Sequence, residues 1–134
     1  MTIVRASKVA WQILSLAGWL ALVPLAAHGQ NNKQVDDLMT QAQTVLSKGK
    51  PEEAVSLLRK AIDLEPTRAD LYLLRSRARD SSGKFEAALE DASKFVELEP
   101  LEALGYLNRA RIYLSLDKKN EALADANKAI ELAP

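Results

Sequence analysis

Side chains of the kinds that usually carry catalysis are scarce in this chain of 134 residues. The sequence has one histidine, His28, no cysteine, and no glycine-rich loop of the kind that cradles phosphate. Histidine is the usual general base and the commonest metal ligand, and cysteine supplies thiol nucleophiles and the ligands of zinc and iron–sulfur sites. The composition therefore predicts a protein that is not an enzyme and has no cofactor and no metal site.

Aspartate and glutamate are the remaining candidates for acid–base chemistry. Three acidic pairs are adjacent in sequence: Asp36–Asp37, Glu52–Glu53 and Glu90–Asp91. Neighbouring residues of a helix point about 100° apart, so the two carboxylates of a pair do not converge on one site. We interpret all three pairs as solvated helix faces.

Arginines make the most basic region of the chain, with Arg75, Arg77 and Arg79 followed later by Arg109 and Arg111. One interpretation is a groove in which guanidinium groups bind carboxylates or an acidic peptide in bidentate fashion. The other is pairing within the molecule, with the arginine stems packed on a neighbouring helix. The overall charge adds no further indication, because 18 basic residues balance 18 acidic ones. We therefore expect no nucleic-acid partner.

The segment 1–29 differs from the rest of the chain, since it contains no acidic residue. Arg5 and Lys8 precede an apolar run, residues 9–27, which Pro24 interrupts near its end. This order is typical of a secretory signal peptide cut after Gly29, and predicts export to the periplasm or the outside of the cell. An uncleaved membrane anchor over residues 9–27 is the alternative, and a buried helix is the third. With either of the first two, the folded part lies outside the cytoplasm.

The remainder of the chain repeats itself at a regular interval. Pro66, Pro100 and Pro134 are equally spaced, and the words before them match: AIDLEP, FVELEP and AIELAP. Two further columns share this interval, Ala54–Ala88–Ala122 and Leu38–Tyr72–Tyr106. Agreement of independent columns at one period indicates a repeat architecture.

Within each unit, apolar residues recur three or four apart, as amphipathic helices require. Gly49 and Gly83 suit helix ends, and Pro51 suits a first turn. Thr67 followed by Asp70 predicts a capping box, and Asp117 replaces the glycine in the third unit. Together these signals predict helices near residues 33–47, 51–64, 68–81, 84–98, 101–116 and 118–132.

The interval between the equivalent residues is 34 residues. The pattern resembles the tetratricopeptide repeat family, whose 34-residue unit has alanine near position 20 and proline near position 32. The resemblance implies an all-α, right-handed α-solenoid of three helix-turn-helix repeats: residues 35–68, 69–102 and 103–134, after a short polar lead at 30–34. Two positions depart from the pattern. Arg79 replaces a large apolar residue, and Phe95 replaces an alanine, which we expect the small Ala92 to offset.

The resemblance also implies a partner-binding groove on the concave side, formed by the first helix of each repeat. The residues that fall at its positions are Asp36, Met39, Gln43, Asp70, Leu73, Arg77, Asp80, Leu104, Leu107, Asn108 and Arg111. Arg75 and Arg109 fall instead at a position where the family uses arginine structurally. One subclass binds C-terminal carboxylates through a clamp of lysine, asparagine and arginine. This chain has Met39, Gln43, Leu74, Leu104 and Asn108 at those positions, so we predict that it is not a chaperone-tail receptor.

The sequence thus predicts a scaffold that binds a protein or peptide partner. A second hypothesis concerns the end of the third repeat, where Leu116, Leu123, Ala126 and Ile130 contribute to an uncovered apolar face. That face would dock another copy of the chain or a partner domain, unless the sequence is a fragment of a longer repeat protein.

Overall fold

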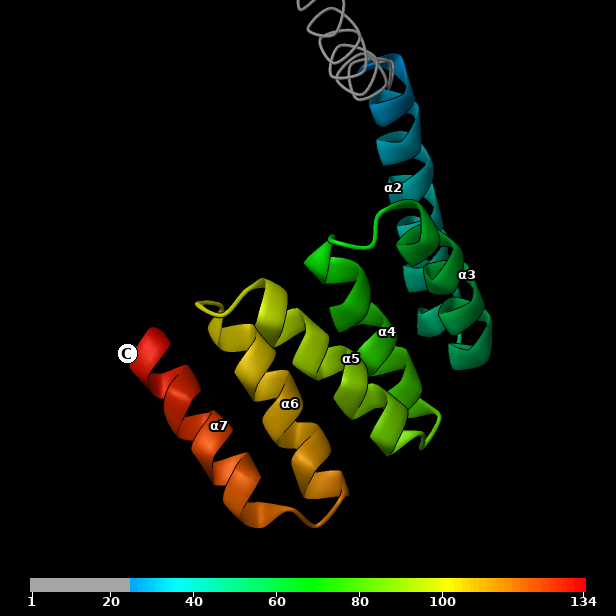
Figure 1. Ribbon diagram of the computed structural model, residues 1–134. Coiled ribbons are helices and arrows are strands. Elements are labelled where there is room, and N and C mark those ends of the chain that lie inside the picture. Colours follow the sequence, from blue (N-terminus) through cyan, green and yellow to red (C-terminus); the bar gives the residue numbers. More distant parts are fainter. Residues whose placement is uncertain (1–24) are drawn as a thin grey trace, which may run out of the picture. The chain divides into compact units, whose positions relative to one another are not determined.

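The computed structural model describes residues 25–134, with side chains from Gly29 onward, and this part of the chain is entirely helical (Figure 1). Its six helices are α2 (Leu25–Ser47), α3 (Pro51–Leu64), α4 (Ala69–Ser81), α5 (Phe85–Leu98), α6 (Ala103–Ser115) and α7 (Lys119–Leu132). None of them is both long enough and apolar enough to cross a membrane. The predicted signal peptide, or anchor, falls mainly on residues 1–24, outside the described residues.

Each repeat turns between its two helices through one residue in the left-handed conformation. Gly49 has φ 74°, Gly83 has φ 72°, and Asp117 takes the same role with φ 55°. In every case two backbone N–H groups bond back to the last turn, as when Lys50 donates to the Val45 carbonyl at 3.0 Å. This is the arrangement that satisfies the last carbonyls of a helix, and it explains why glycine recurs there.

Five of the six predicted helices agree with the structure to within two residues at either end. Helix α2 begins at Leu25, well before the predicted start at 33, because no proline interrupts the chain between 25 and 47 and the polar lead is helical. The predicted capping box is wrong. Arg68 is the residue before α4 and makes no capping hydrogen bond, while the Asp70 carboxylate accepts a hydrogen bond from the Arg68 side chain at 3.0 Å.

The chain divides after Lys33, and residues Gln34–Pro134 form one compact unit. Within it α3 packs on α4, α4 on α5, α5 on α6 and α6 on α7, and α4 also touches α6. Its core holds Leu58, Leu71 and Ile112, none with any exposed surface. The alanines of the repeated column, Ala54 and Ala88, are likewise fully buried, which lets the helices approach closely. The unit therefore contains its own core.

The space for Phe95 comes from a different residue than the sequence suggested. Ala92 is fully buried, but the Phe95 ring lies against Gly105 of the next repeat. A methyl group added to Gly105 would lie 2.5 Å from Phe95 Cδ1 and 2.7 Å from its Cε1. Because such approaches do not occur between real atoms, the large ring and the missing side chain compensate each other across α5 and α6.

Candidate functional site

Two arginines bind buried aspartates inside their own repeats, at equivalent positions. The Arg75 guanidinium donates to both carboxylate oxygens of Asp91 at 2.9 and 2.7 Å, and that of Arg109 to both oxygens of Asp125 at 2.7 and 2.8 Å. The hydrogen bond to Asp125 raises the pKa of Arg109 above its usual range. Burial is the largest single influence on the pKa of Arg75 and lowers it, but the hydrogen bond to Asp91 and the attraction of nearby negative charge together raise the pKa above its ordinary value. Both arginines thus have the structural role expected of them.

Asp91 is not on a solvated face, and that part of the interpretation of the acidic pairs is wrong. The residue is 3% exposed and accepts a third hydrogen bond, from Arg79 Nη1 at 2.9 Å. Arg79 also donates to the Ala87 carbonyl at 3.1 Å. The repeat pattern has a large apolar residue at this position, and arginine is accommodated there because its guanidinium group is paired with Asp91. The signal in the sequence was the equal spacing from arginine to aspartate, which occurs in two repeats.

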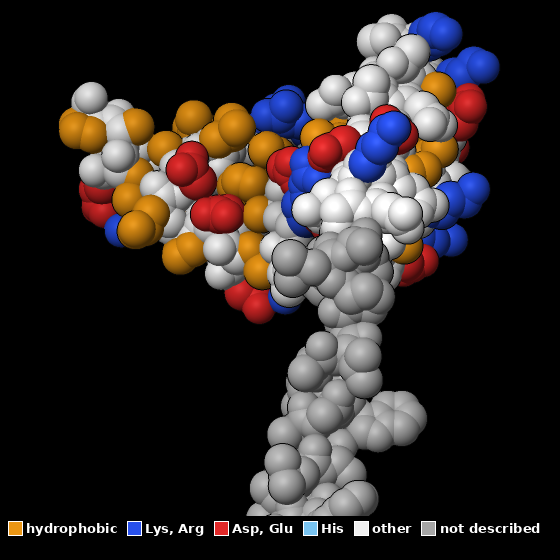
Figure 2. Space-filling model, turned by 90° about the horizontal axis from the view of Figure 1, so that it is seen from above, with side chains coloured by type: hydrophobic (Ala, Val, Ile, Leu, Met, Phe, Trp, Pro, Cys, Tyr) orange, Lys and Arg blue, Asp and Glu red, His pale blue; other side chains and the backbone are white. Residues whose placement is uncertain are grey.

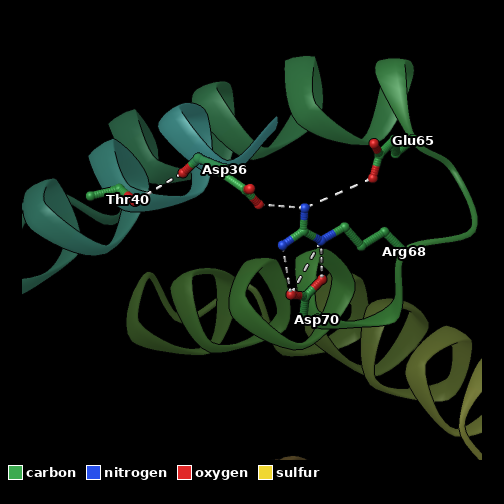
Figure 3. Close-up of polar contacts among 5 residues, drawn as sticks. All are labelled: Asp36, Thr40, Glu65, Arg68 and Asp70. Atoms are coloured by element: carbon green, nitrogen blue, oxygen red, sulfur yellow. Dashed lines mark hydrogen bonds and ion pairs between the residues drawn. The ribbon is translucent and has the colours of Figure 1, made fainter. Parts of the chain in front are cut away.

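Arg68, which the sequence did not single out, joins the first two repeats. Its guanidinium pairs with Asp36 of α2 at 2.6 Å, with Asp70 of α4 at 3.0 Å and with Glu65 at 3.8 Å (Figure 3). The hydrogen bond to Asp70 is the main reason that the pKa of Arg68 lies above its usual range. Asp36 and Asp70, two predicted groove residues, are therefore partners of one arginine.

Helices α4 and α6 share a second polar contact on their facing sides. The Asn108 amide donates to the Ser76 hydroxyl at 3.0 Å, and that hydroxyl donates to the Ala88 carbonyl at 3.0 Å. Arg111 then pairs with Asp80 at 3.0 Å. Asn108 is only 6% exposed, so its amide serves the packing of the two repeats and is not open to a ligand.

Two adjoining cavities remain open on α4 and α6. The first, here called the loop cavity, measures about 550 Å³ and lies where the α3–α4 and α5–α6 connections approach each other. It is lined by Thr67, Arg68, Ala69, Asp70, Leu73, Phe95, Glu99, Glu102 and Leu104. The second, the arginine cavity, measures about 180 Å³ and is lined by Arg77, Leu104, Leu107, Asn108 and Arg111. We call the surface that holds both the groove surface.

The groove surface contains most of the residues predicted from α4 and α6. Leu73 is 8% exposed and lines the loop cavity, whereas Leu104 and Leu107 are 45% and 52% exposed and are open to a ligand. The two remaining predicted residues are on α2, where Met39 is half-buried against the core and Gln43 is exposed. Within the described residues no cluster of acidic or histidine side chains is arranged to hold a metal ion.

A third cavity, of about 300 Å³, lies on the outer side of the last repeat. It is lined by Ala110, Leu114, Lys119, Ala122, Leu123 and Ala126. We call these residues, together with Ile130, the C-terminal face. Leu123 and Ile130 are 62% and 64% exposed, although Val55 and Ile62, at the same positions of the first repeat, are each 8% exposed. A following repeat covers these positions elsewhere in the chain, and no described residue covers them here.

The geometry agrees with comparisons to known proteins. Family models described as tetratricopeptide repeat match residues 45–90 and 103–134, which together make up more than half of the chain. No curated protein matches the sequence.

Solved structures share the fold. The Arabidopsis OM64 TPR domain is 25% identical with a TM-score of 0.74, and the match covers 78% of this chain and 86% of that one. The first TPR of Spaghetti (RPAP3), bound to the HSP90 peptide SRMEEVD, is 26% identical with a TM-score of 0.73, over 76% and 81%. MamA is 24% identical with a TM-score of 0.71, over 75% of this chain but 58% of its own length. The all-α solenoid fold is confirmed, and the chain belongs to the tetratricopeptide repeat family.

Proposed function

We propose that this protein is an interaction scaffold that binds an extended or helical segment of another protein on its groove surface. The observation that carries the proposal is the pair of open cavities on α4 and α6, which share the half-exposed Leu104. Apolar side chains beside oriented polar groups are what a peptide needs in order to bury its own apolar residues and fix its direction.

The relatives support binding of a protein segment without identifying it. The RPAP3 domain, 26% identical to this chain, is bound to an HSP90 peptide. The clamp positions of this chain are occupied differently, since Leu74 is half-buried and Asn108 bonds to Ser76. The partner therefore differs from the acidic chaperone tails, and a labelled SRMEEVD peptide should bind more weakly to this protein than the natural partner does.

The test is capture of the partner with matched variants of the full chain. Leu104→Ser with Leu107→Ser removes apolar surface from both cavities, and Leu123→Ser removes a similarly exposed leucine from the C-terminal face. We expect the first variant to lose the captured protein while the second retains it, both with unchanged circular dichroism. Equal capture by the two variants would place the partner somewhere other than the groove surface.

We further propose that the protein acts outside the cytoplasm, exported by its N-terminal segment or anchored by it. The support is the sequence of residues 1–29, in which two basic residues precede an apolar run. Fractionation of cells followed by N-terminal sequencing decides between the alternatives. A mature chain that begins at Gln30 fits a cleaved signal, an intact membrane-bound chain fits the anchor, and a cytosolic chain contradicts export.

A second candidate function is self-association or domain docking through the C-terminal face. The specific observation is the exposure of Leu123 and Ile130 at positions that are buried in the first repeat. A surface of this kind usually marks an interface. Light scattering of the full chain, compared with a Leu123→Glu variant, tests self-association. A monomer at every concentration used rules it out, while docking of another domain would appear as capture that Leu123→Ser abolishes.

A further inference from the structure

We propose that the groove surface selects a segment in which a basic residue and an acidic residue flank an apolar one. The basic residue enters the loop cavity, the apolar residue covers Leu104, and the acidic residue meets the arginine cavity. This inference rests on the proposed function and specifies the chemistry of the partner.

The loop cavity carries negative charge that the fold does not compensate. Its charged lining consists of Arg68 and the carboxylates of Asp70, Glu99 and Glu102. Arg68 is already paired with three carboxylates of the fold. Glu99 and Glu102 are exposed, and no lysine or arginine of the described part of the chain lies within 4.0 Å of either. A lysine or arginine side chain of a partner therefore supplies the charge that this cavity lacks.

The arginine cavity has the opposite sign. Arg111 is balanced by Asp80 at 3.0 Å, but Arg77 has no carboxylate within 4.0 Å among residues 29–134. One positive charge is thus left for a ligand, and the guanidinium geometry favours a carboxylate.

Leu104 makes the two cavities one binding surface, because it lines both. On one side it adjoins Leu73 and Phe95, the apolar lining of the loop cavity, and on the other the exposed Leu107. Figure 2 views the molecule from the end with the α3–α4 and α5–α6 connections, and there acidic side chains lie among hydrophobic ones over the C-terminal helices. The order of charges along the groove surface is therefore acid, apolar, base.

This order also discriminates against other ligands. A segment with acidic residues along its whole length would bring carboxylates against Glu99 and Glu102, and an entirely basic segment would meet Arg77. Repulsion of that kind gives specificity beyond what the attractive contacts provide. A bipolar segment is the one class that satisfies both cavities.

Four short fluorescein-labelled peptides of equal length test the inference with the full chain, and binding is followed by fluorescence anisotropy. They differ only at the two positions that flank a central leucine pair: lysine with glutamate, glutamine with glutamate, lysine with glutamine, and glutamate at both. We expect the bipolar peptide to bind best, with each neutral replacement costing about three- to fivefold in Kd and the doubly acidic peptide weaker still. The advantage should shrink with added salt, because the charged groups are exposed.

Protein variants locate the charges. Glu99→Gln with Glu102→Gln should weaken the lysine-containing peptides about three- to tenfold and leave the glutamine–glutamate peptide unchanged. Arg77→Gln should weaken the bipolar and the glutamine–glutamate peptides to a similar extent and leave the lysine–glutamine peptide unchanged. The matched control is Glu86→Gln with Glu90→Gln, which removes two exposed acids of α5 that line neither cavity. Glu102 makes no capping hydrogen bond with its side chain, so its replacement spares the start of α6.

The outcomes separate this inference from the proposed function. Equal affinity for all four peptides, lost on Leu104→Ser, contradicts charge selection but leaves the groove surface as the binding site. Best binding of the doubly acidic peptide contradicts the inference in the same way. Absence of binding by every peptide, in a chain whose circular dichroism is native, contradicts both proposals.

Discussion

Gly105 shows how one residue type can depend on a neighbour in another helix. Helical glycine normally costs about 1 kcal/mol relative to alanine, so Gly105→Ala should stabilise an isolated helix. Here the added methyl group would lie 2.5 Å from the Phe95 ring. We predict that Gly105→Ala lowers the free energy of unfolding by about 1–3 kcal/mol. Urea denaturation of the two proteins measures this difference in the free energy of unfolding.

The control for this prediction is the double variant Gly105→Ala with Phe95→Leu. The smaller side chain makes room for the methyl group, so the second change should recover part of the loss even though Phe95→Leu alone is destabilising. Additive effects of the two changes would show that the ring and the glycine do not compensate each other.

Asp91 is the residue on which the pairing of the second repeat depends. It accepts hydrogen bonds from Arg75 and Arg79 and is 3% exposed, so Asp91→Ala leaves two guanidinium groups without a carboxylate to balance their charge. We predict a loss of about 3 kcal/mol in the free energy of unfolding. Glu90→Ala, at the exposed neighbour, is the matched control and should change it by less than about 0.5 kcal/mol. Similar effects of both changes in thermal unfolding would contradict the pairing.

A single exposed ion pair gives the pH dependence that the structure predicts most directly. The hydrogen bond from the Lys84 ammonium, at 3.0 Å, is the main reason that the pKa of Glu52 lies below its ordinary value of 4.5. Because the pKa is lower in the folded state, the ion pair contributes stability that is fully present above the ordinary pKa of 4.5. This contribution is lost as the pH falls through the lowered pKa of the folded state. Lys84→Gln should therefore raise the pKa of Glu52, measured by NMR titration of its side-chain carboxyl. An unchanged pKa would show that the pair does not form in solution.

The helices themselves could be predicted from the sequence, because local signals specify them. The regular repeat, the apolar spacing and the glycines at 49 and 83 predict five helices to within two residues at either end. The start of α2 could not be predicted, because residues 25–32 contain no proline or other signal that separates them from the helix that follows. The capping box failed for a tertiary reason, because Asp70 is engaged by Arg68, which also reaches Asp36 on another helix.

The turn between α6 and α7 offers a test of the local signals. Asp117 adopts φ 55° where the first two repeats have glycine, and a non-glycine residue is strained in that region. Asp117→Gly should raise the free energy of unfolding by about 0.5–1 kcal/mol, and Gly83→Asp should lower it by a similar amount. The ion pair of Asp117 with Lys119 is exposed and offsets little of this. A destabilised Asp117→Gly in chemical denaturation would contradict the account of this turn.

At the scale of the whole molecule, the sequence predicted which residues share one surface of α4 and α6 better than it predicted the contacts that those residues make. Leu104, Leu107, Arg77 and Arg111 do line the arginine cavity. Asn108 lines it too, but its amide is used within the fold, by Ser76. The acids Glu99 and Glu102 were not foreseen, because they lie in a connection between helices and reach the loop cavity only once two repeats are stacked.

Stacking also explains why the groove surface is a property of neighbouring repeats and not of one hairpin. Each hairpin buries its apolar side against the next, and the cavities arise where α4 and α6 meet. The contacts of Arg68 with Asp36 and of Asn108 with Ser76 span the same distance in sequence and hold consecutive repeats in register. Binding of a segment across two repeats should thus stabilise the array as a whole.

The most direct test of the central claim is an NMR titration of the isotope-labelled full chain with the bipolar peptide, with backbone amide shifts followed residue by residue. We expect the largest changes at Leu73, Arg77, Leu104 and Leu107, together with the α5–α6 connection that carries Glu99 and Glu102. Changes that gather instead on α7 around Leu123 would contradict it, because the partner would then occupy the C-terminal face and not the groove surface.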